Sequence, residues 1–329
     1  MIRILHDTSY DFIRWWKWAV GLTAAFIALG LGSLALQGIN YSIEFTGGTM
    51  MQVEFSKPVD VAALRAALDN AAIHGAEIQQ FGTNREFTIR AQEAEQAGAK
   101  TTGAETVAGR IRNVLTTRYG SDQIRVVRTE AVGPRVGSEL RRDAVIAMFL
   151  SFLVTTVYLA IRFEWRFGVA ALIATGHDVF TTLAFLKLLH LEVSLTVVAA
   201  ILTVIGYSLN DTIIIFDRVR EDLRKGRKET LYQTLNRAIN ETLPRSILTH
   251  ATTLAATLAL LFFAGEVIRP FAWVMAFGIF TGTFSSIYIA SPVLLWIERK
   301  WPRKTATSKG TLTATRTSPT RRSTATAAT

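Results

Sequence analysis

An aspartate in the middle of a long apolar segment is the strongest chemical signal in this sequence. Asp211 lies within residues 195–216, in which the only other ionisable side chain is the weakly acidic Tyr207. An ionised carboxylate in hydrocarbon costs from roughly 3 kcal/mol upward, so such residues usually face a bundle interior or a water-filled cavity. Asp211 is therefore a candidate for a group that binds and releases a proton. The alternative is a neutral or paired carboxyl that only fixes helix packing.

Polar residues surround Asp211 on the helix that this segment predicts. Asn210 precedes it directly, and Ser208 and Tyr207 lie three and four residues earlier, on the same helical face. Gly206 would let another backbone approach closely at this level. Burial disfavours the charged form of a carboxyl and a nearby cation favours it. A conformational change that moves a cation would therefore switch the proton on Asp211.

A second carboxyl lies in the middle of another apolar segment, residues 167–189. There Asp178 follows His177, and the helical rise of 1.5 Å per residue places Asp178 about 15 Å from the same end at which Asp211 lies about 10 Å deep. The two carboxyls and the imidazole are therefore expected in one polar layer. Asp178 is interpreted as functional or network-forming. His177 is either a proton relay or only a hydrogen-bonding partner, and both readings stay open.

Two further polar features lie in the fifth and sixth apolar segments. His250 is close to one end of residues 247–264, where an interfacial or capping role is expected. The sixth segment carries a stripe of small residues, which is typical of helix-packing surface, with the wall of a hydrated path as the alternative. This stripe comprises Gly278, Thr281, Gly282, Thr283, Ser285 and Ser286.

The elements that position these residues are membrane-spanning helices. Half of the 329 residues are hydrophobic, the mean hydropathy is +0.27, and a spanning helix needs about 20 mostly apolar residues. The sequence therefore predicts a polytopic α-helical membrane protein. The first segment follows basic residues as a signal sequence does, but it lacks a small-residue cleavage site and is interpreted as an uncleaved anchor. The six predicted helices span residues 18–36, 144–161, 167–189, 195–216, 247–264 and 271–296.

The distribution of lysine and arginine predicts the orientation of these helices. Basic residues cluster in the segment 1–17, in the predicted loop 217–246 and in the tail 299–329. These three parts are therefore expected in the cytoplasm, so that both termini are cytoplasmic. The insert 37–142 is expected to be exported, and the other five helices lie within 143–298. The tail is basic and poor in apolar residues, and is expected to be disordered near anionic lipid. No nucleic-acid partner is expected, because no recognition pattern accompanies the charge.

The exported insert predicts a ferredoxin-like domain with the order βαββαβ. Its one histidine, His74, is isolated, so the domain is interpreted as a scaffold or interaction module. Gly47 and Gly48 are either a simple turn or a tight backbone approach to a membrane element, and residues 92–102 read as a flexible loop. Alternation predicts strands at 42–45, 50–55, 77–81, 86–90 and 124–132, and helical spacing predicts helices after 58–60 and over 105–119.

Several reaction classes find no support in the sequence. It contains no cysteine, which excludes disulfides, iron–sulfur clusters and thiol catalysis. No predicted helix carries a Walker loop, a His-Glu-x-x-His pair or a Gly-x-Ser-x-Gly elbow. We therefore expect no catalytic residues, no metal and no cofactor. Energy for any movement would come from an ion gradient or from a partner.

Taken together, four segments resemble the SecF family, the smaller membrane subunits of the bacterial SecDF protein-translocation motor. The likeness runs from about residue 10 to about residue 300, and Ala290-Ser-Pro292 adds to it. The segments are Ile43-Glu-Phe-Thr-Gly-Gly-Thr49, Gly133-Pro-Arg-Val-Gly-Ser-Glu-Leu140, Gly176-His-Asp178 and Ile205-Gly-Tyr-Ser-Leu-Asn-Asp-Thr-Ile-Ile-Ile-Phe-Asp-Arg218.

The resemblance implies an architecture like that of resistance–nodulation–division (RND) transporters and a partner, SecD, with an equivalent six-helix bundle. It implies that the fourth-span carboxylate faces an Asp–Arg pair in SecD, and that proton passage there moves the exported domains. Asp211 occupies the matching position, and Asp178 matches a third-span motif inferred to support it. The sequence departs from the family at His250, where a small hydroxyl residue is commoner, and at Glu44, where aspartate is commoner.

The resemblance thus predicts a subunit of the bacterial cytoplasmic (inner) membrane that pulls the preprotein after the SecYEG channel and SecA have begun its transfer. The coupling ion is expected to be H⁺, with Na⁺ as the alternative. Two other functions stay open: a proton-coupled small-molecule efflux subunit of the RND superfamily, and an intramembrane aspartyl hydrolase that uses Asp178 and Asp211.

Overall fold

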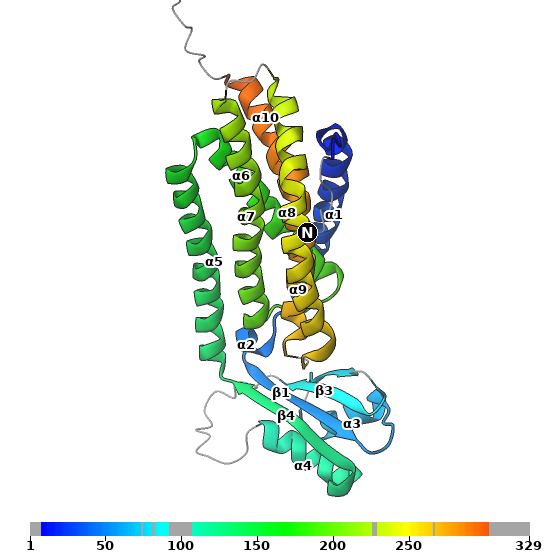
Figure 1. The fold of residues 1–329 in the computed structure, drawn as a ribbon. Helices are drawn as coiled ribbons and strands as arrows, with labels where there is room; N and C mark the ends of the chain where they lie inside the picture. The colour runs from blue at the N-terminus through cyan, green and yellow to red at the C-terminus, as the bar shows by residue number, and fades with distance from the viewer. Residues whose placement is uncertain are drawn as a thin grey trace, which may run out of the picture.

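A bundle of long helices stands on a small sheet domain (Figure 1). The computed structural model describes residues 8–73, 75–80, 83–91, 107–225, 229–265 and 267–302. The predicted fold class, six spanning helices with a βαββαβ domain, is confirmed. His74, residues 92–102 and the tail from 303 onward lie outside the described residues.

Six helical segments of the bundle are long and apolar enough to cross a membrane. In the most apolar stretches of α7 and of the last segment, 56% and 67% of residues are buried, against 6% and 11% in α1 and α5. The segments that carry Asp211 and the small-residue stripe are therefore central. The bounds are α1 Trp16–Gln37 (preceded by the turn Ile13–Trp15), α5 Pro134–Arg162, α6 Trp165–Leu188, α7 Leu195–Arg224, α8 Leu231–Phe263, and α9 Arg269–Ser285 followed by the π-helical turn Ser286–Ala290 and α10 Ser291–Lys300.

The segment 217–246 is mostly helix, and its prediction as a loop is wrong. α7 continues to Arg224, and α8 begins after Thr230, whose hydroxyl accepts from the backbone N–H of Gln233 while the Gln233 side chain accepts from the backbone N–H of Thr230. Hydropathy marks where the apolar stretch ends. Helical backbone does not stop there, because Arg, Glu and Lys are good helix formers. Likewise α5 begins at Pro134, ahead of the predicted boundary at 143.

The sheet domain has four antiparallel strands in the order β2-β3-β1-β4, the ferredoxin-like arrangement. Two helices cover one face of the sheet, and the other face is turned toward the bundle (Figure 1). Leu64, Leu68, Ile111 and Leu115 of these helices are fully buried against the sheet. The elements are β1 Gly48–Phe55, α3 Val61–Asn70, β2 Glu77–Gln80, β3 Glu86–Ala91, α4 Val107–Tyr119, the turn Ser121–Gln123 and β4 Ile124–Val132.

Residues 43–45 belong to a short helix, α2 (Ile43–Thr46), and Ser42 precedes it as the N-cap, so the prediction of 42–45 as a strand is wrong. Extended pairing lasts only for the bridge between Tyr41 and Val193, after which the chain turns. At the end of this turn Gly47 has φ +75°. A Cβ there would lie 2.7 Å from the Cα of Pro134. Of the two alternatives for this glycine, the tight backbone approach to a membrane helix is therefore the one observed.

Candidate proton-coupling site

Asp178 is held by three helices and is 1% exposed. Its Oδ2 accepts hydrogen bonds from the hydroxyls of Ser208 on α7 and Ser285 on α9, the latter at 2.7 Å. Its Oδ1 lies 3.1 Å from Nδ1 of the adjacent His177. The buried carboxyl therefore has the polar partners that a carboxyl in a low-dielectric interior needs. Ser208 was predicted beside Asp211, but its hydroxyl contacts the other carboxyl.

Asp211, a residue of α7, faces α8 and is 2% exposed. Ser246 donates from its hydroxyl to Oδ1 at 3.3 Å, and Nε2 of His250 lies 3.1 Å from Oδ2. Nδ1 of the same imidazole lies 2.9 Å from the hydroxyl of Thr283 on α9. The prediction of an interfacial or capping role for His250 is therefore wrong. Its depth along the helix was readable from the sequence, but the rotation of α8 that turns it inward was not.

The sites of the two carboxyls are neighbours on α7. Ser208 contacts Asp178 and lies three residues before Asp211 on α7. The partner of one carboxyl and the other carboxyl itself are therefore one helical turn apart. The hydrogen-bond partners of Asp178 and Asp211 do not overlap. This geometry does not favour a hydrolase dyad, in which two carboxyls share one proton. Each carboxyl instead has its own histidine.

Glycines on α9 let α7 come close enough for these contacts. A Cβ at Gly278 would lie 2.2 Å from a methyl of Val204, and a Cβ at Gly282 would lie 3.0 Å from the Cβ of Ser208. Part of the predicted small-residue stripe is thus the packing surface for α7, as small residues are at many helix interfaces in membranes. Ser285 and Ser286 of the same stripe are buried, and Ser286 bonds Thr212 of α7 at 2.8 Å.

Gly206 and Asn210 lie on the exposed face of α7, away from both carboxyl sites. Both are exposed, and no described atom lies within 4 Å of where a Cβ at Gly206 would be. The prediction that Gly206 receives another backbone is therefore not met within the described chain, where glycines of α9 serve that role. The side-chain amide of Asn210 forms no hydrogen bond with the described residues, although its backbone lies within α7. Successive helical residues point about 100° apart, so Asn210 cannot share the direction of Asp211.

The backbone changes its winding directly beside Asp178. The π-helical turn begins one residue after Ser285, and the hydroxyl of Ser291 donates to the carbonyl of Ser286 at 3.0 Å. Pro292, which has no N–H to donate, follows at once. Such single π turns are frequent at functional sites. Here the turn was not readable from the sequence, although Ser291-Pro292 marks where it ends.

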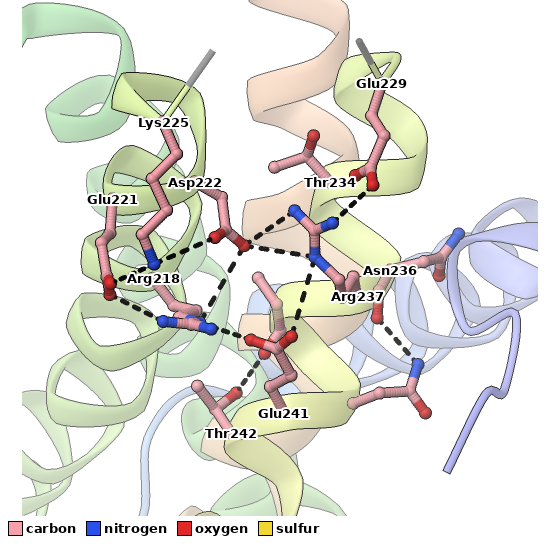
Figure 2. Close-up of polar contacts among 12 residues, drawn as sticks. Arg218, Glu221, Asp222, Lys225, Glu229, Thr234, Asn236, Arg237, Glu241 and Thr242 are labelled. Atoms are coloured by element: carbon pink, nitrogen blue, oxygen red, sulfur yellow. Dashed lines mark hydrogen bonds and ion pairs between the residues drawn. The ribbon is translucent and has the colours of Figure 1, made fainter. Parts of the chain in front are cut away.

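An ion-pair cluster joins α7 to α8 at the end of the bundle opposite the sheet domain (Figure 2). Asp222 of α7 has a side chain that is 0% exposed, and Arg237 of α8 donates to it at 2.9 Å. Arg237 also pairs with Glu229 at 2.5 Å, and Arg218 of α7 pairs with Glu241 of α8. The sequence indicates an orientation through these basic residues, but no local pattern in it identifies their carboxylate partners.

A cavity of about 1250 Å³ opens beside this cluster. Its lining includes Tyr10 of the N-terminal segment and Arg218 and Glu241 of the cluster. It extends to Ile214 and Arg245, each within one helical turn of a residue of the Asp211 site. Water in this cavity can therefore come within one helical turn of the buried carboxyl.

The comparisons with known proteins agree on one family. The family model for the protein export membrane protein SecD/SecF, C-terminal, matches residues 112–300, and the SecD/SecF GG motif matches residues 32–59, which contain Gly47 and Gly48. The protein translocase subunit SecF of Gemmatimonas aurantiaca is 62% identical over 305 residues, covering 92% of this chain and 91% of that protein. The SecF subunit of Escherichia coli O157:H7 is 37% identical over 291 residues, covering 88% of each chain.

Solved structures point the same way. The crystal structure of SecDF from Thermus thermophilus, described as a translocon-associated membrane protein, superposes with a TM-score of 0.79 at 35% identity over 91% of this chain. A SecDF structure in the super-membrane-facing form gives a TM-score of 0.65 at 36% identity. This chain spans 40% of the length of each SecDF chain.

Proposed function

Because this multi-pass membrane protein belongs to the SecF family of protein translocase subunits, we propose that it uses the proton-motive force, together with SecD, to drive late preprotein translocation. It would act in the bacterial cytoplasmic membrane after the SecYEG channel and SecA have begun the transfer. The end of the bundle that carries the ion-pair cluster would lie in the cytoplasm together with both termini, and the sheet domain would be exported.

The observation that carries this proposal is the position of Asp211. It is a buried carboxyl on a spanning helix, and its side-chain partners among the described residues, Ser246 and His250, come from a second helix. Gain or loss of one proton changes which of these contacts are favourable, and so changes how α7 packs against α8. One elementary charge that crosses 100 mV releases about 2.3 kcal/mol, enough to bias such a pair of helices.

A physical connection from α7 to the sheet domain supports the second half of the proposal. The first residue of α7, Leu195, donates its backbone N–H to the carboxylate of Glu44 in α2, and α2 leads through Gly47 into β1. A shift of α7 along its axis would therefore move α2 and Gly47, the short connection that leads into the sheet domain. Arg90 of β3 adds an ion pair to Glu192, three residues before α7 begins.

The exposed face of α7 is the surface that we assign to SecD. Gly206 and Asn210 lie four residues apart on it, and a polar amide facing lipid is unfavourable. A second bundle seated there would cover the amide and could approach closely at the glycine. This chain matches only part of the SecDF chain, which leaves room for such a bundle.

The proposal is tested by preprotein import into inverted membrane vesicles that contain SecD and this subunit, with and without a proton gradient. Asp211→Asn should abolish the stimulation by the gradient and leave co-purification with SecD unchanged. Asp69→Asn, an exposed carboxyl of α3, is the matched control. Normal stimulation by the Asp211→Asn protein would refute the proposal.

A further inference from the structure

His250 connects Asp211 to a third helix through both ring nitrogens. Nε2 lies 3.1 Å from Oδ2 of Asp211, and Nδ1 lies 2.9 Å from the hydroxyl of Thr283. The ring also packs 5.4 Å from the ring of Tyr207, centroid to centroid, and the His250 side chain is 12% exposed. The imidazole is therefore held in one place with a hydrogen-bonding group at each end.

The Thr283 hydroxyl has one hydrogen and two acceptors within reach, and it can donate to either of them in turn. It lies 3.1 Å from the carbonyl of Ile279 on its own helix as well as 2.9 Å from Nδ1 of His250. When the hydroxyl donates to Nδ1, the imidazole is neutral and carries its proton on Nε2. When the hydroxyl turns to Ile279, its oxygen can accept a hydrogen bond from a protonated Nδ1. Both protonation states of His250 fit the same heavy-atom positions.

From this geometry, and resting on the proposed function, we propose that His250 relays protons to Asp211 and that Thr283 is the hydroxyl that permits it. One H⁺ adds to Nδ1 and forms an imidazolium, while the hydroxyl of Thr283 turns to Ile279. The Nε2–H bond then breaks and an O–H bond forms on Oδ2 of Asp211. Asp211 becomes a neutral acid, and His250 is again neutral with its proton on Nδ1. The relay resets after Asp211 has released its proton: one H⁺ adds to Nε2 and one H⁺ leaves Nδ1, which restores the starting form of the ring, and the hydroxyl of Thr283 turns back to donate to Nδ1.

The charged and titratable groups around His250 fit this role. From α7 it faces Asp211 and Tyr207, and on its own helix Arg245 lies five residues earlier. The one charged residue of α9, Arg269, is at the other end of that helix. On α6, Asp178 and His177 contact each other, and Asp178 takes its other bonds from two serines. Asp211 is therefore the carboxyl that pairs with His250.

The first test is ¹⁵N NMR of histidine-labelled protein in complex with SecD in lipid. The chain has five histidines, so the His250 signals are assigned by their loss in His250→Asn. The titration runs from about pH 8 to about pH 5, and the proposal expects the charged form of His250 to grow as the pH falls. Thr283→Val removes the acceptor for Nδ1–H and should lower the imidazolium population at a given pH about tenfold, whereas Thr283→Ser should preserve it. A neutral imidazole throughout, or equal titration in both Thr283 variants, would overturn the relay.

The second test is the vesicle assay over the same pH range. His250→Asn keeps a hydrogen-bonding side chain but cannot titrate, so gradient-driven import should fall at least about tenfold and lose its dependence on pH between about 6 and 8. A normal rate and pH profile would sink the relay alone, provided that Asp211→Asn is inactive. An active Asp211→Asn protein would instead sink the proposed function. If His250→Asn does not fold, the pair of Thr283 variants decides the question by NMR.

Discussion

The carboxylate of Glu44 accepts a hydrogen bond of 2.6 Å from the backbone N–H of Leu195, the first residue of α7. The first N–H groups of a helix lack partners within the helix and carry partial positive charge, so an acidic side chain is stabilising there. Glu44 of α2, which leads into the sheet domain, therefore anchors the first turn of α7, the helix that contains Asp211.

Glu44→Ala removes this anchor. We expect a loss of about 1 kcal/mol in the free energy of unfolding, measured in detergent, because the N–H of Leu195 loses a charged acceptor. Gradient-driven import should fall as well, since α7 and α2 would no longer move together. Glu77→Ala, at an exposed position of β2, is the control and should change stability by less than about 0.5 kcal/mol. Equal stability of the two variants would contradict the anchoring role.

Gly47→Ala should destabilise the junction of the sheet domain and α5. The new Cβ would lie 2.7 Å from the Cα of Pro134, at a residue with φ +75°. Gly75 is a matched control, because it has φ +72° but no described atom within 4 Å of where a Cβ would be. We expect about 1–2 kcal/mol for the strain in Gly75→Ala and clearly more in Gly47→Ala, measured by thermal unfolding. Similar costs at both sites would mean that the junction can open without penalty.

Arg237→Gln should weaken the packing of α7 against α8 at the ion-pair cluster. It leaves the fully buried carboxylate of Asp222 without its closest cation, and removal of one partner of a buried pair costs about 3–5 kcal/mol. Screening at the partly exposed arginine puts the expected loss near the lower end of that range. Arg135→Gln disrupts an exposed pair with Glu139 and should cost less than about 0.5 kcal/mol. Chemical unfolding in mild detergent measures both, and a loss no larger than the control would show that Asp222 finds other partners.

The assignment of the SecD-facing surface predicts a pattern of cross-links. The chain has no cysteine, so single cysteines can be placed without background. Gly206→Cys and Asn210→Cys should form disulfides with cysteines on the facing SecD helix. Ala200→Cys, at a residue that is 0% exposed within this chain, should not. Cross-links from Ala200→Cys but not from the two exposed positions would place SecD on another face.

The candidate site shows how far local sequence patterns reach. Depth along a span is a matter of counting residues, and the two carboxyls that this count placed inside the bundle, Asp178 and Asp211, are both buried. Which helix each one meets depends on how neighbouring helices are rotated, and no local pattern contains that information. Ser208 was therefore placed beside the wrong carboxyl, and His250 was placed at an interface although it contacts Asp211.

The sequence by itself determined the class of the protein, because apolar length and strand alternation follow directly from the cost of burying polar groups. It determined the six spans, the order of the sheet domain and the two carboxyls that need partners. The tertiary structure decided the partners. Gly278 and Gly282 receive α7 whereas Gly206 is exposed, and Gly47 meets Pro134. Such pairings arise only when separate helices are brought together, since the space beside a glycine is set by another part of the chain.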